Sequence, residues 1–157
     1  MLPSPPYQDL LRAVGRLLDR EGWRDVALAE EPEGLRVRGT RPAGAERAAA
    51  ELRLTLEDLA RLRREAQQQR GWIPPGDAAG YEGRLRAIGW LAEVAGLRAL
   101  RVAEAGENLL LHGRVAGAPA GGRRVVDKQL TPAEIDRLLA RLHGLRGTDT
   151  GQLRPWW

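Results

Sequence analysis

Residues 7–39 read YQDLLRAVGRLLDREGWRDVALAEEPEGLRVRG, and residues 81–113 read YEGRLRAIGWLAEVAGLRALRVAEAGENLLLHG. The second stretch repeats the pattern of the first at an offset of 74 residues. Identical residues at matched positions include a leading tyrosine, two glycines and a leucine: Tyr7 and Tyr81, Gly15 and Gly89, Gly22 and Gly96, Leu35 and Leu109. A pattern that recurs at a fixed spacing indicates an internal duplication, which constrains the fold before any single element is assigned.

The match resumes later in each copy, where LTLEDLARL from Leu54 aligns with LTPAEIDRL from Leu130. Its offset is 76, so the second copy carries two extra residues between the matched blocks. We therefore predict a first repeat over 1–71, a Pro/Gly-rich linker over 72–80, a second repeat over 81–147 and a flexible tail over 148–157 that ends in Trp-Trp.

Each copy begins with a predicted helix and continues as strands. Apolar residues from Tyr7 to Leu18 recur every three or four positions, which gives a helix one apolar stripe. Gly22 then suits a left-handed helix end, because glycine has no Cβ to clash there. After this glycine, Val26 and Leu28 alternate with polar or small residues, as in a strand with one buried face.

The strands are joined by turns and lead into a second helix. Residues 31–34 predict a hairpin turn in which Gly34, or Asn108 in the second copy, takes a positive φ. A third strand is expected over 50–54. The next helix starts with a hydroxyl and a carboxylate three residues apart, as in a capping box: Thr55 with Asp58, and Thr131 with Glu134.

The predicted fold class is therefore α+β, built as a tandem duplication of an α-β-β-β-α unit. Each unit is expected to form an antiparallel three-stranded sheet with helices on one face. One such unit has a small core, so two of them packed together as an intrachain pseudo-dimer would be more stable than either alone.

Composition excludes several classes of protein. The 157 residues are 43% hydrophobic and 29% charged, as in soluble globular proteins. No apolar run approaches the roughly 20 residues that cross a bilayer, and the start of the chain does not resemble an export signal. The chain has no cysteine, which fits a cytoplasmic protein. Heavy use of Ala, Arg, Gly and Leu is typical of a GC-rich prokaryote, and the scarcity of Asn, Cys and Met suits a thermophile.

The sequence predicts no enzyme. Its two histidines, His112 and His143, stand at unmatched positions, and no nucleophile, phosphate-loop or metal-ligand motif is present. We therefore expect no catalytic residue, no cofactor and no metal site. A small enzyme with a cleft between the repeats is an alternative, and it would depend on Glu30, Glu104 or His112.

Differences between the copies predict a protein partner. The second copy has apolar residues where the first has arginines: Trp90 for Arg16, Val94 for Arg20 and Leu110 for Arg36. Such residues, together with Trp156 and Trp157 at the end of the chain, are typical of binding anchors. Two alternatives stay open: Trp90 and Val94 could pack against the first repeat, and the tail could fold back onto its own chain. The favoured function is a non-enzymatic scaffold or accessory protein that binds another protein.

A nucleic-acid-associated protein is the alternative within binding functions. The net charge is only +4, with 25 basic and 21 acidic residues interleaved, so the chain lacks the dense positive field of a dedicated nucleic-acid binder. An anion could nevertheless bind an arginine-rich sheet face of the first copy, with Arg36, Arg38 and Arg53. It could also bind the loop at Gly121–Arg124 in the second copy, with Arg123 and Arg124.

Overall fold

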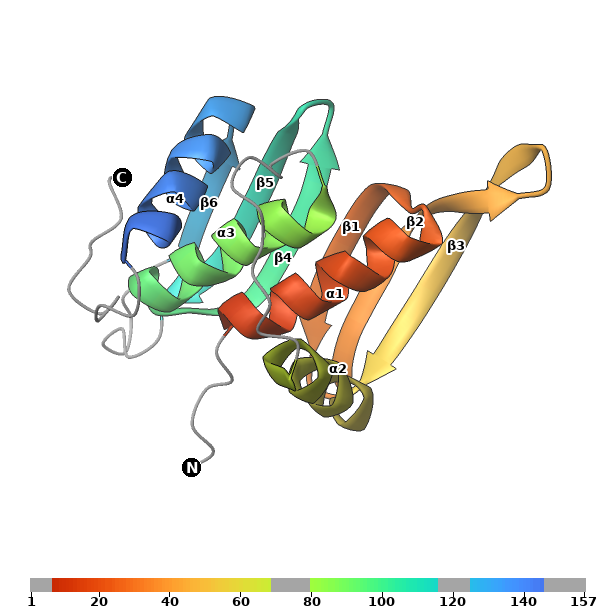
Figure 1. The fold of residues 1–157 in the computed structure, drawn as a ribbon, viewed down its shortest axis with the longest axis horizontal. Helices are drawn as coiled ribbons and strands as arrows, with labels where there is room; N and C mark the ends of the chain where they lie inside the picture. The colour runs from red at the N-terminus through yellow and green to blue at the C-terminus, as the bar shows by residue number, and fades with distance from the viewer. Residues whose placement is uncertain (1–6, 69–79, 116–124, 146–157) are drawn as a thin grey trace.

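The structure is a computed structural model that describes residues 7–68, 80–115 and 125–145. Over these ranges the chain is an α+β protein with four helices and one six-stranded antiparallel sheet (Figure 1). The predicted tail and nearly all of the predicted linker lie outside the described residues.

The first half contains five elements in the predicted order. They are α1 (Tyr7–Glu21), β1 (Arg24–Glu31), β2 (Gly34–Ala43), β3 (Glu46–Thr55) and α2 (Leu56–Gln68). Helix α1 is followed by Gly22 at φ 74°, which confirms the left-handed end. Val26 and Leu28 are buried on one face of β1, as their alternation predicted. Strand β3 is longer than the predicted 50–54, because it runs on along β2 as a projecting hairpin (Figure 1).

The second half follows the same order. Its elements are α3 (Tyr81–Ala95), β4 (Leu97–Ala105), β5 (Asn108–Val115), β6 (Val125–Leu130) and α4 (Pro132–Leu145). Gly96 caps α3 at φ 68°, again as predicted. The prediction for Asn108 is wrong, since the positive φ of this turn is at Gly106, with φ 63°. A glycine two residues earlier takes the left-handed position without steric cost, and Asn108 starts the strand instead.

Both capping boxes are present. The Thr55 hydroxyl accepts from the backbone N–H of Asp58 at 3.1 Å, and the Asp58 carboxylate accepts from the N–H of Thr55 at 3.0 Å. Thr131 and Glu134 make the same pair of hydrogen bonds at 3.2 and 3.4 Å. Because these bonds satisfy backbone donors that a helix leaves free, they fix where α2 and α4 begin.

The two sets of three strands join into one sheet, in the order β3-β2-β1-β4-β5-β6. Separate sheets would leave the backbone groups of β1 and β4 unpaired at their edges. Instead β1 and β4 pair antiparallel, with Ala27 opposite Ala103 and Ala29 opposite Arg101. We call this central pairing the seam. All four helices lie over one face of the sheet, with α1 beside α3 in the middle (Figure 1).

Glycines let α1 and α3 approach each other closely. The carbonyl oxygen of Tyr81 lies 2.5 Å from where a Cβ of Gly15 would be, and the carbonyl oxygen of Tyr7 lies 2.4 Å from where a Cβ of Gly89 would be. The backbones therefore touch at two points related by the 74-residue offset. Neither position has room for a side chain.

Each of these helices also supplies a cap to the other. Asp19, near the end of α1, accepts from the backbone N–H groups of Tyr81 at 2.8 Å and Glu82 at 3.0 Å. Glu93, near the end of α3, accepts from the N–H of Gln8 at 3.3 Å, and burial raises the pKa of this carboxyl. Free N–H groups at both helix starts thus gain carboxylate acceptors from the opposite half.

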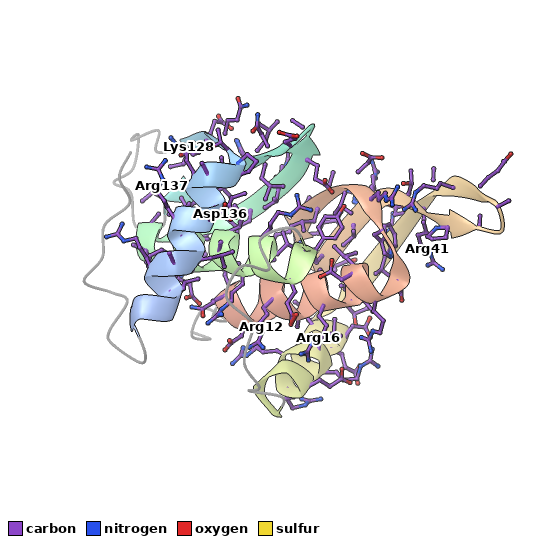
Figure 2. The ribbon with its side chains drawn as sticks, turned by 45° about the horizontal axis from the view of Figure 1, so that its top comes forward. Arg12, Arg16, Arg41, Lys128, Asp136 and Arg137 are labelled. Atoms are coloured by element: carbon purple, nitrogen blue, oxygen red, sulfur yellow. The ribbon has the colours of Figure 1, made fainter. Side chains whose placement is uncertain are left out.

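Ion pairs add to the contact between α1 and α3. Arg12 and Arg16, one turn apart on α1 (Figure 2), both reach Glu82 of α3, at 3.6 and 3.1 Å. No helix within the described ranges is long and apolar enough to cross a membrane.

Candidate functional site

The sheet face opposite the helices is open and carries the candidate site. Strand alternation directs alternate residues of all six strands to this face. The backbone register lines up eight of them in two rows across four strands: Arg38, Ala27, Ala103 and Leu110 in one row, and Arg36, Ala29, Arg101 and His112 in the other.

A broad hollow of about 650 Å³ follows these rows across the seam. Ala27, Ala29 and Ala103 form its floor, and their methyl groups leave the space that larger side chains would fill. Leu110 lines one side and is 43% exposed, which is unusual for a leucine on a strand of this sheet. The floor is thus apolar and recessed, as in surfaces that receive a partner's side chain.

Charged groups surround this floor, and many of them are already paired. Glu51 of β3 lies 3.5 Å from Arg38, 3.8 Å from Arg36 and 3.9 Å from Arg53. Arg36 also forms an ion pair with Glu31. The arginines predicted for an anion-binding face therefore do lie together, but they share carboxylates of the same surface.

The opposite side of the hollow has a different charge arrangement. His112 of β5 lies 2.5 Å from Asp127 of β6, through its Nδ1. Arg101 of β4 lines the hollow and is exposed, and no carboxylate lies within ion-pair distance of it among the described residues. Arg101 is consequently the cation of this face that is best placed to meet a partner's carboxylate.

Of the predicted anchors that the structure describes, Leu110 alone is on this open face. Trp90 is 2% exposed, which favours the alternative that it packs within the chain over its role as a binding anchor. Helix α3 contacts α1, α4 and the sheet, and it is therefore apolar on more sides than one stripe predicts. Val94 is half-buried against the same core. Packing within the chain, the alternative left open by the sequence, accounts for both residues.

Four of the predicted anchors and anion-binding residues cannot be located on the fold. Trp156, Trp157, Arg123 and Arg124 lie outside the described residues. The described ranges contain no group of three or more side chains that could hold a metal ion.

Glu30 and Glu104, two residues of the enzyme alternative, accept backbone hydrogen bonds beside the seam. The register of each hairpin shifts at the start of β1 and β4, where Asp25 and Ala99 take positive φ values of 53° and 54°. These bulges release backbone N–H groups from the ladder. Glu104 accepts from Val26 N–H at 3.0 Å, and Glu30 accepts from Leu100 N–H at 3.4 Å.

Each of these two carboxylates also accepts a hydrogen bond from a tyrosine hydroxyl. Tyr81 donates its hydroxyl to Glu104, and Tyr7 bonds to Glu30 in the same way. Arg84 lies 3.8 Å from Glu104 and 4.8 Å from the Tyr81 ring. Strand alternation directs the side chains of Glu30 and Glu104 to the helix side and that of His112 to the open side. Glu30 and His112 both line the hollow, but Glu104 does not.

Alkaline titration should show how the seam holds its tyrosines. Burial raises the pKa of Tyr7 and Tyr81, and the hydrogen bond to a carboxylate raises it further. An unfolded tyrosine titrates near pH 10. The stability that the two buried tyrosines contribute is therefore fully present below about pH 10 and is lost as the pH rises above it.

Both tyrosines of the chain belong to these sites. We therefore expect tyrosinate absorbance to appear in one cooperative step, together with loss of the circular dichroism signal. Tyr81→Phe should halve its amplitude. Gradual titration around pH 10 with an unchanged dichroism signal would show that the tyrosines are not held as described.

The residues that the sequence reasoning missed are the floor alanines and Arg101. Alternation with Val26 and Leu28 puts Ala27 and Ala29 on the outward side of a strand, but it does not show which residues lie beside them across the seam. Once β1 is known to pair with β4, the small residues Ala27 and Ala103 lie opposite each other and indicate a recessed surface.

In comparisons with known proteins, no family model, curated protein or solved structure matches this chain.

Proposed function

We propose that this protein is a non-enzymatic protein-binding module whose partner lies on the open face of the sheet. The observation that supports this most strongly is the hollow of about 650 Å³ on the face opposite the helices. Its alanine floor would receive an apolar side chain, next to the exposed Leu110. Binding energy at protein interfaces is concentrated in such central apolar contacts.

The charges around the floor favour an acidic partner segment. Arg101 has no carboxylate partner among the described residues, and Arg38 is paired only with a half-exposed Glu51, at 3.5 Å. A carboxylate on the partner would form ion pairs with these arginines, while the apolar side chain beside it enters the hollow. Nucleic acid is the weaker candidate, because Glu31, Glu51 and Asp127 would lie near its phosphates.

We also propose that the two halves arose by tandem duplication and pack as an intrachain pseudo-dimer about the seam. The contacts that support this come in pairs at the 74-residue offset: Gly15 and Gly89, Asp19 and Glu93, Glu30 and Glu104. In this proposal, the duplication created the binding surface, since the hollow spans the seam where β1 meets β4. A cytoplasmic location stays a prediction.

Peptide binding measured by fluorescence polarisation tests the proposed function. The probe is a labelled peptide of alternating leucine and glutamate, compared with a leucine–lysine peptide and with labelled oligothymidylate. Ala103→Glu would fill the floor and repel carboxylates, so we expect it to raise the Kd of the leucine–glutamate peptide about tenfold. Ala60→Glu, on the exposed surface of α2, is the matched control and should leave the Kd unchanged.

Three results would contradict the proposal. These are no binding of the leucine–glutamate peptide, an equal affinity of the Ala103→Glu variant, and preferential binding of oligothymidylate with a steep dependence on salt. The last would favour the nucleic-acid alternative.

A further inference from the structure

Strand β3 forms an unusually open edge of the sheet. It pairs with β2 over all ten residues from Glu46 to Thr55 without a bulge. Among the described residues, no strand pairs with its other side. Residues 41–49, at the projecting end of this hairpin, are all exposed. Figure 1 shows the hairpin extending beyond the rest of the sheet.

This edge carries charged residues, but it lacks several other features by which proteins prevent strands from pairing. Edge strands are usually short, interrupted by a bulge, or protected by lysine or proline. The opposite edge follows this rule: β6 has six residues and includes Lys128 (Figure 2). In contrast, β3 contains neither lysine nor proline, and its middle is the run Ala48–Ala50. A long edge without a bulge is a template for another strand.

We propose that β3 pairs antiparallel with β3 of a second copy, about a twofold axis at Ala49. The two sheets then continue as one, in the same way that β1 and β4 join within the chain. A twofold axis perpendicular to the sheet keeps both helical layers on one side and both open faces on the other. The inference is independent of the proposed peptide binding, because it uses the edge of the sheet and not its face.

Charge selects the register. In a continuous sheet, residues opposite each other must point to the same face, so the axis must pass through a residue and not between two. With the axis at Ala49, Arg47 of each copy lies opposite Glu51 of the other. Moving the axis to Ala50 would place Arg47 opposite Arg53, and moving it to Ala48 would place Arg47 opposite Ala49. Of the three axes that pass through the alanine run, only the one at Ala49 therefore puts opposite charges across from each other, twice.

The guanidinium of Arg47 now bonds to residues on the β2 side of β3, and it would turn toward the free edge to meet Glu51 of a second copy. Its Nε and Nη2 donate to Thr40 and to the carbonyl of Gly22, at 3.2 and 2.6 Å. No carboxylate lies within ion-pair distance of it among the described residues. Glu51 of the second copy would supply that carboxylate and would lose little mobility, since it is already held between arginines.

Single cysteines in this cysteine-free chain test both the dimer and its register. Opposite Cα atoms of an antiparallel pair are about 4.5–5.5 Å apart, within the range of disulfides. Ala49→Cys should therefore form a disulfide-linked dimer rapidly on mild oxidation. Ala45→Cys is the matched control on the same hairpin, and its thiols would be about 27 Å apart in this register. It should cross-link at least about tenfold more slowly.

Sedimentation equilibrium completes the test without any crosslink. The wild-type chain should have twice the mass of one 17.3 kDa chain. Arg47→Glu, which places glutamates opposite each other, should raise the dimer Kd about tenfold, and Arg41→Glu should have little effect. A monomeric wild type, or equally fast cross-linking of Ala45→Cys and Ala49→Cys, would overturn the proposal.

Discussion

Replacing Gly89 with valine is expected to lower the free energy of unfolding by about 3 kcal/mol, the upper part of the range for overpacked sites. The new Cβ would overlap the carbonyl of Tyr7, and backbone atoms cannot swing aside as a flexible side chain would. Helices α1 and α3 would have to separate, which would open the middle of the core above the seam. Denaturant unfolding followed by circular dichroism measures the change.

The control separates this overlap from the weaker helix propensity of valine. Ala140→Val lies at an exposed position of α4 and should cost less than about 1 kcal/mol. Gly15→Val, against the carbonyl of Tyr81, should resemble Gly89→Val. If Gly89→Val is no more destabilising than Ala140→Val, then α1 and α3 do not approach as closely as described.

Replacing Glu104 with alanine should cost about 3 kcal/mol, because a partly buried carboxylate with several partners would be lost. The N–H of Val26 and the hydroxyl of Tyr81 would lose their acceptor, and Arg84 would lose its nearest carboxylate. The bulge at the start of β1 would then hold a free backbone donor next to the seam. The destabilisation should appear as a lower denaturant midpoint at neutral pH.

Two further variants are expected to lose less stability than Glu104→Ala. Tyr81→Phe keeps the ring and removes one hydrogen bond to Glu104, so it should cost about 1 kcal/mol. Glu107→Ala, in the exposed turn two residues after β4 ends, should change stability by less than about 0.5 kcal/mol. Equal losses for Glu104→Ala and Glu107→Ala would mean that the carboxylate does not support the seam.

Local features of the fold were predictable from neighbouring residues. Gly22 and Gly96 end helices, the Thr55 and Thr131 boxes begin them, and the alternation at Val26 shows which face of β1 is buried. Each of these signals depends on residues close in sequence, and on backbone conformations that few residue types adopt.

Features that depend on contacts between the halves were not predictable. Trp90 is buried because α3 is enclosed by α1, α4 and the sheet, which no single-helix pattern reveals. Glu30 and Glu104 look like solvated strand ends until the bulges at Asp25 and Ala99 free the N–H groups that they accept from. Likewise, the hollow requires Ala27 to face Ala103, and this pairing spans more than half of the described chain.

The central claim is that the open face around the seam is the binding surface. The most direct test records backbone amide NMR shifts while the leucine–glutamate peptide is added. The account predicts the largest shifts at Ala29, Arg101 and Ala103, which lie over the hollow, and no change at Leu59 or Leu139 on the helical side. Shifts confined to the helices, or spread evenly over the chain, would contradict it.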